Sequence, residues 1–76
     1  MTPQQCRMAR AGLKWNIDDL ADEAELGRAT VARFESGKTI DEVSLQKLKL
    51  AFARRRVKFV NDGPFKGAVY MGMRAS

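Results

Sequence analysis

The segment Asn16–Lys38, which reads NIDDLADEAELGRATVARFESGK, predicts two short helices joined by a tight turn. Its first residue, Asn16, is a favoured N-cap because its side chain accepts a hydrogen bond from a free amide of the first turn. Asp18 and Asp19 lie in that turn, where negative charge suits the helix dipole. Apolar residues recur at three- and four-residue spacing along this helix, at Ile17, Leu20, Ala21 and Ala24.

The second helix of the segment is expected to begin near Gly27 and to end at Ser36–Gly37. Glycine is the residue that most readily terminates a helix in the left-handed conformation, which suits Gly37. Val31 and Phe34 supply a short apolar stripe. The side opposite that stripe holds Ala29, Ala32, Arg33 and Ser36, with Arg28 on the flank. Since about two residues separate the two helices, they must cross steeply.

This pattern resembles the helix-turn-helix of the lambda-repressor-like (Cro/cI-type, XRE) family. Within the segment the resemblance rests on Leu20-Ala21, Ala24, Leu26, Thr30-Val31 and the run Phe34-Glu35-Ser36-Gly37-Lys38. It extends upstream through Arg10, Leu13 and Trp15-Asn16, and downstream through Leu45, Leu48 and Phe52. The resemblance implies a mainly α fold of four to five helices. It also implies that the second helix of the motif enters the DNA major groove, in a dimer that places two such helices one turn of the duplex apart.

Three positions depart from the family pattern. Glu25 stands where the turn usually has glycine, and a left-handed conformation at a glutamate costs on the order of 1 kcal/mol. Gly27 stands where a serine or threonine commonly caps the recognition helix. Ile17 stands where a polar, phosphate-facing residue is common, although the helix N-terminus can itself hold a phosphate.

The contacts implied by the resemblance divide into two kinds. Base reading is assigned to Arg28, Ala29, Thr30 and Arg33, because arginine can pair with guanine O6 and N7, and small methyl groups can touch the thymine methyl. For Arg33 a phosphate contact is the alternative. Phosphate binding is assigned to Asn16, Ile17, Gly27, Ser36, Lys38 and Thr39, with Lys14 and Arg7 as weaker candidates.

Arg10 and Glu35 are expected to form a structural ion pair and not a DNA contact. The helical wheel puts Glu35 near the apolar side of its helix, where an unpaired charge would be costly. Arg10 lies at the place in the first helix from which family members pair with that acid.

Composition agrees with an anionic partner. The chain has 76 residues, which is the size of one small domain, and its net charge is +5 with a pI near 9.9. Five of its nine acids lie between Asp18 and Glu25, so the remainder is more basic than the total suggests. With no histidine and one cysteine, Cys6, the chain offers too few ligands for a zinc finger and cannot form an internal disulfide. We therefore expect no metal, no cofactor, no small-molecule ligand and a cytoplasmic location. The short apolar runs predict neither a membrane span nor a signal peptide.

The residues outside the motif are expected to form its scaffold and a C-terminal β-hairpin. Thr2 and Pro3 begin the first helix, and Ser44 is expected to cap the fourth. Val57–Val60 and Ala68–Met71 read as strands around turn residues. The chain then divides into a DNA-binding domain, 1–56, and a hairpin extension, 57–76. The hairpin is expected to supply a homodimer interface through Val57, Phe59, Val60, Val69, Tyr70 and Met71, since a sheet edge readily accepts a strand from a second chain. The competing interpretation is that the hairpin only caps the core of its own chain.

Three hypotheses about function follow from these features. The first is a sequence-specific DNA-binding transcriptional regulator that acts as a homodimer on a (pseudo)palindromic operator. The alternative is a protein-interaction module, or an antitoxin or antiactivator, that uses the same fold to cover a protein partner. Arg28 and Arg33 on the second motif helix argue against that alternative. An enzyme is disfavoured because the sequence has no histidine, no catalytic cysteine context and no glycine-rich phosphate loop.

Overall fold

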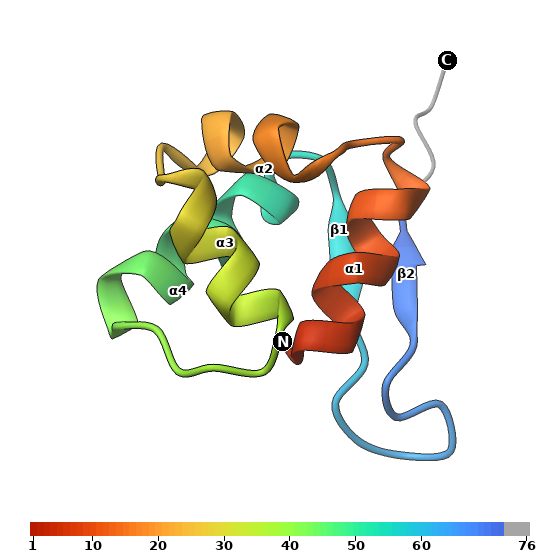
Figure 1. Cartoon of the computed structure of the whole chain (residues 1–76). Helices are drawn as coiled ribbons and strands as arrows, with labels where there is room; N and C mark the ends of the chain where they lie inside the picture. The colour runs from red at the N-terminus through yellow and green to blue at the C-terminus, as the bar shows by residue number, and fades with distance from the viewer. Residues whose placement is uncertain (73–76) are drawn as a thin grey trace.

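The computed structural model describes residues 1–72 as four helices followed by a two-stranded sheet (Figure 1). The elements are α1 (Pro3–Gly12), α2 (Ile17–Ala24), α3 (Arg28–Glu35), α4 (Glu42–Ala53), β1 (Val57–Phe59) and β2 (Val69–Met71). The predicted mainly α class with a short hairpin is confirmed, with four helices in the part of the chain that is described. None of these helices has the length and apolar character needed to cross a membrane.

Three helices, α1, α2 and α4, begin at side chains that satisfy a free amide of the first turn. The Asn16 side chain accepts from the Asp19 amide at 2.8 Å, and the Asp19 carboxylate accepts from the Asn16 amide at 2.9 Å. The cap of α4 is Asp41, so the prediction of Ser44 is wrong by three residues. The Asp41 carboxylate accepts from both the amide and the hydroxyl of Ser44, at 3.2 and 2.6 Å, and these bonds lower the pKa of Asp41. Ser44 therefore lies inside the first turn as the donor to the cap.

The turn between α2 and α3 has the left-handed residue expected from the sequence. Glu25 has φ 56° and ψ 46°, and the next amide, of Leu26, donates to the carbonyl of Ala21 at 2.9 Å. Gly37 ends α3 in the same region, with φ 94°. The ends of α2 and of α3 are thus each followed by a left-handed residue, a conformation that glycine adopts freely and glutamate does not.

Glu25→Gly should raise the free energy of unfolding by about 1 kcal/mol, because glycine adopts this conformation without steric cost. Urea unfolding followed by circular dichroism measures the change. Glu25→Gln is the matched control, since it removes the charge and keeps the strain, and it should leave stability near that of the wild type. A glycine variant no more stable than the glutamine variant would show that the turn stores no strain.

The core lies where all four helices and β1 meet. Its buried apolar residues are Cys6, Ala9, Leu20, Ala21, Ala24, Val31, Phe34, Leu48, Ala51, Phe52 and Val57. Phe52 is fully buried: its ring stacks on Trp15 with centroids 6.0 Å apart and makes a T-shaped contact with Phe59, with centroids 5.6 Å apart. The alanines let the helices approach closely, so a short chain can bury a continuous core.

The hairpin packs on the helices of its own chain. Its antiparallel register pairs Val57 with Met71, Lys58 with Tyr70 and Phe59 with Val69. Side chains alternate along a strand, so the first and third pairs share one face, and all four of these residues pack in or against the core. In Figure 1, α1 lies beside the strands; it contacts β2, while α4 contacts β1. The hairpin thus closes one side of the helical core.

A buried side chain of α1 holds the hairpin against the helices through hydrogen bonds. The Nε2 atom of Gln5 donates to the carbonyls of Val60 and Ala68, at 3.0 and 3.3 Å, just beyond the strand ends. Gln5 is fully buried, so the two bonds satisfy groups that are out of reach of water.

Most of the hairpin side chains predicted to form a dimer interface pack within their own chain, and the dimer itself stays a prediction. The core of their own chain uses Val57, Phe59, Val69 and Met71, which leaves Tyr70, at 64% exposed, as the large outward side chain of the strands. Val60 is half-buried and lies beyond the end of β1. The competing interpretation, in which the hairpin caps its own chain, describes the observed packing.

Candidate nucleic-acid interface

The side of α3 that faces solvent is narrow, basic and lined by small residues. Arg28, Ala29, Ala32, Arg33 and Ser36 are exposed along it, and Thr30 is half-buried at its edge. Val31, Phe34 and Glu35 face inward. The four residues predicted to read bases therefore lie on one helix, with three of them exposed to solvent.

Glu35 is the single acidic residue between Gly27 and Thr39, and it is turned away from that surface. Its side chain is only 6% exposed. Lys38 and Thr39 continue the exposed surface just past the helix end. Residues 27–39 consequently present Arg28, Arg33 and Lys38 without an exposed acid.

The carboxylate of Glu35 is held by the predicted pair with Arg10. Arg10 Nε lies 2.9 Å from Glu35 Oε2, and Arg10 Nη2 lies 2.9 Å from Glu35 Oε1, which is a bidentate geometry. The thiol of Cys6 donates to Oε2 at 3.3 Å. The hydrogen bonds that Arg10 donates to Glu35 raise the pKa of Arg10, and burial raises the pKa of Cys6 well above its usual value. The pair fixes α3 to α1, and the cysteine is a protonated packing residue.

Arg7 also has a structural role. One of its Nη atoms donates to the backbone carbonyl of Glu35, near the C-terminal end of α3. A cation at this end suits the helix dipole. Two arginines of α1 thus hold the inner side of α3, and the weak assignment of Arg7 to phosphate binding finds no support in its position.

The N-terminus of α2 is poorly suited to hold a phosphate through the predicted side chains. Asn16 is engaged in its capping box with Asp19, and Ile17 is half-buried against the core. Asp18 and Asp19 add negative charge in the same turn. Only the backbone amide of Ile17 is therefore suited to bind a phosphate. The backbone amide and the side-chain oxygen of Asn16 are both used in the capping box.

The N-terminus of α3 is more open. Gly27 caps it without a side-chain hydrogen bond, and no atom beyond its two chain neighbours lies within 4 Å of where a β-carbon of Gly27 would be. At the other end, the Ser36 hydroxyl donates to the carbonyl of Arg33 at 2.9 Å, and its oxygen stays exposed as an acceptor. Of the residues predicted to contact phosphate, Gly27, Lys38 and Thr39 are exposed at the two ends of α3, and their role stays a prediction.

Arg28 has a partner that was not predicted from the sequence. Its Nε atom lies 2.9 Å from Oδ1 of Asp18, in an ion pair between the first turns of α3 and α2. The two side chains are 68% and 66% exposed. No local signal in the sequence singles out Asp18, which lies at the end of α2 away from the turn.

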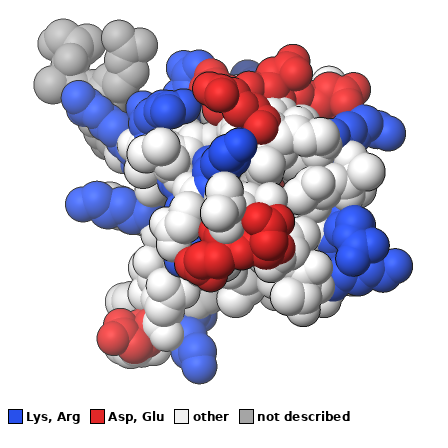
Figure 2. Space-filling view, turned by 90° about the vertical axis from the view of Figure 1, so that its left-hand side faces the viewer, with Lys and Arg blue, Asp and Glu red and all other residues white. Residues whose placement is uncertain are grey.

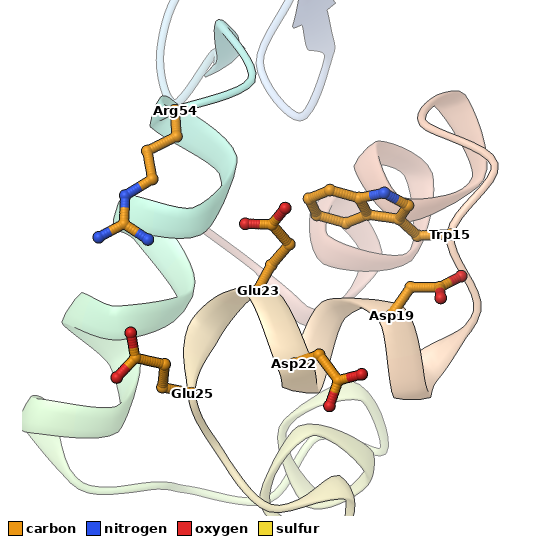
Figure 3. A pocket seen from close by; sticks show the side chains of 6 residues that line it. All are labelled: Trp15, Asp19, Asp22, Glu23, Glu25 and Arg54. Atoms are coloured by element: carbon orange, nitrogen blue, oxygen red, sulfur yellow. The ribbon is translucent and has the colours of Figure 1, made fainter.

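A second surface, on α2, has the opposite charge. A hollow there is lined by Trp15, Asp19, Asp22, Glu23, Glu25 and Arg54 (Figure 3). Arg55 pairs with Glu23 and lies over the Trp15 ring at 5.5 Å from its centroid, so the basic run after α4 serves in part to fasten α2. Residues 1–72 contain no group of three or more acidic, cysteine or histidine side chains placed to hold a metal ion.

The charges are therefore distributed unevenly over the molecule. In the view of Figure 2, acidic side chains gather at the top and in the middle, and most lysines and arginines lie toward the edges. A flat anionic partner would meet the basic side of α3 favourably and the acidic side of α2 unfavourably.

Comparison with known proteins finds no family model, no curated protein and no solved structure that matches this chain. The family resemblance thus rests on the residues quoted from the sequence.

Proposed function

We propose that this protein is a sequence-specific, double-stranded DNA-binding transcriptional regulator of the lambda-repressor-like (Cro/cI-type, XRE) kind. In this proposal α3 enters the major groove of a (pseudo)palindromic operator bound by a homodimer. The observation that carries the proposal is the outward side of α3, where two arginines stand among small residues while the single acid of the helix is buried and paired.

This surface suits the major groove in shape and in charge. A groove of B-DNA admits one helix, and small side chains such as Ala29 and Ala32 let the helix backbone approach the base edges. Arg28 and Arg33 are then long enough to reach guanine O6 and N7, while Thr30 and Ala29 offer methyl groups to thymine. The open amides at Gly27 and the side chains of Lys38 and Thr39 provide the contacts that fix the helix on the backbone.

The homodimer follows from the small size of the reading surface. One α3 spans only a few base pairs, and two-fold operators match two-fold proteins. The hairpin of residues 57–76 remains part of the proposed dimer region through its outward face, where Tyr70 is exposed, and Leu50 on α4 is a second exposed apolar side chain. We also propose that the protein is not an enzyme and that it acts in the cytoplasm, where the free, buried thiol of Cys6 would stay reduced.

A protein-interaction module, or an antitoxin or antiactivator, is the second candidate. The acidic surface of α2 favours it, because such a surface would attract a basic protein and repel DNA. The two candidates differ in where the binding energy lies. DNA binding depends on Arg28 and Arg33, whereas a basic protein partner would depend on the acids of α2.

Arg28→Ala and Arg33→Ala should each weaken binding to the preferred duplex by about 1–3 kcal/mol and relax preference at particular base pairs. Lys38→Ala should instead weaken binding to all sequences alike and reduce its dependence on salt, since a phosphate contact releases counterions without reading sequence. Mobility shifts at two salt concentrations, on a duplex enriched from a random pool and on a random duplex, measure both effects. Equal losses on the two duplexes for Arg33→Ala would make Arg33 a phosphate contact, and binding unaffected by any of the three variants would exclude this interface.

A further inference from the structure

We infer that Asp18 is a positioning residue for Arg28, and that it sets base specificity at the position Arg28 reads without touching DNA itself. The inference rests on the proposed function and names a residue on the neighbouring helix as part of the reading apparatus. It starts from the ion pair between Asp18 Oδ1 and Arg28 Nε, 2.9 Å apart.

The ion pair is made at Nε, the innermost nitrogen of the guanidinium. A guanidinium has five N–H donors, and four of them are on the two Nη nitrogens. The Nη nitrogens form the fork that matches guanine O6 and N7. A carboxylate close to Nε therefore restricts the orientation of the guanidinium by charge attraction, while Nη donors remain to meet a base.

The ion pair contributes to binding more by restricting the orientation of the Arg28 side chain than by the attraction between the two charges. An exposed ion pair is weak in water. Arg28 is nevertheless a long side chain, and binding must immobilise it; a side chain already held in one orientation loses less freedom on binding. When DNA covers the pair and excludes water, the attraction between the two charges also becomes stronger.

The same carboxylate should act against binding wherever Arg28 has no guanine to read. Asp18 stands at the edge of the proposed interface, where its charge repels phosphates of any sequence. Losing Asp18 should thus affect the two kinds of DNA differently. It should weaken binding to the preferred duplex, which needs an oriented Arg28, and leave binding to random DNA unchanged or stronger.

The neighbouring acids do not share this role and supply the control. Asp19 is engaged in the capping box with Asn16. Asp22 is exposed on the same helix, one turn further on, and takes part in none of the ion pairs found among residues 1–72. Asp22→Ala therefore removes the same charge from α2 without touching Arg28.

The test compares Asp18→Ala, Asp18→Asn, Asp22→Ala, Arg28→Ala and the double variant Asp18→Ala/Arg28→Ala. The probes are the duplex that the wild type enriches from a random pool and a random duplex of equal length. We expect Asp18→Ala to lose about two- to tenfold in affinity for the enriched duplex and none for the random one. The base pair whose preference it relaxes should be the one relaxed by Arg28→Ala. Asn keeps an acceptor for Nε, so Asp18→Asn should retain part of the preference, and the double variant should lose no more preference than Arg28→Ala alone.

Two results would overturn the inference while leaving the proposed function standing. One is an Asp18→Ala variant that behaves like Asp22→Ala on both duplexes. The other is an Arg28 Nε–H group that is equally mobile in the free wild type and in Asp18→Ala, as measured by nitrogen-15 relaxation. A wild type that enriches no sequence would instead reject the proposed function, and the inference with it.

Discussion

Arg10→Met should lower the free energy of unfolding by about 3 kcal/mol or more, because it leaves the buried carboxylate of Glu35 without a cation. The carboxylate is 6% exposed and receives two charge-assisted bonds from Arg10, while its remaining side-chain partner, the Cys6 thiol, is a weak donor. Urea unfolding at neutral pH, followed by circular dichroism, measures the loss.

Two variants separate the buried charge from other causes. Arg33→Met removes an arginine from the exposed side of α3, and its stability should stay within about 0.5 kcal/mol of the wild type. Arg10→Met/Glu35→Met removes both charges and should recover much of the loss, since a buried pair replaced by apolar residues is often neutral. An Arg10→Met variant with wild-type stability and weakened DNA binding would mean that Arg10 belongs to the DNA interface.

Deletion of residues 57–76 should abolish cooperative folding. The deletion removes Val57 from the core, together with Phe59, Val69 and Met71, which pack against it. Burying one such side chain fully contributes about 1.5–3 kcal/mol, and small domains have total stabilities of about 5–15 kcal/mol. The deletion also leaves the buried amide of Gln5 without its two carbonyl partners. Thermal and urea unfolding of the chain ending at Arg56 measure the effect.

Point variants on the two faces of the hairpin compare the contribution of its inward and outward side chains to stability. Phe59→Ala should cost about 2–3 kcal/mol, because the ring packs edge-on against Phe52 and is only partly exposed. Tyr70→Ala, on the outward face, should change stability by less than about 0.5 kcal/mol. Sedimentation of Tyr70→Ala then reports separately on self-association. A truncated chain that unfolds cooperatively like the wild type would contradict the packing role of the hairpin.

Local signals in the sequence predicted the motif well. The start of α2 at Asn16, the left-handed residue at Glu25 and the end of α3 near Gly37 each depend on the chemistry of one or two residues and their neighbours. The pairing of Arg10 with Glu35 spans two helices, and it was accessible because the acid falls on an apolar face and the family resemblance supplies its partner.

Features that depend on how elements meet in space were harder to predict. Alternation along β1 and β2 shows that Phe59 and Val69 share a face, but it does not show whether helices of the same chain or a second chain cover that face. Gln5 shows that α1 of the same chain covers the hairpin. Its buried side-chain amide needs acceptors, and the carbonyls of Val60 and Ala68 supply them. The Asp18–Arg28 pair was missed for the same reason, because ten positions separate the two residues along the chain.

The central claim is that the outward side of α3 is the surface that binds DNA. The most direct test follows the amide resonances of the nitrogen-15-labelled protein while the duplex enriched from a random pool is added. The largest shifts should fall on residues 27–39, together with Asp18, and smaller shifts on the outer face of α4 and the hairpin, where two copies meet in the proposed homodimer. The account would be contradicted if the largest shifts fell on the acidic side of α2 around Asp22 and Glu23, or if saturating duplex left residues 27–39 unchanged.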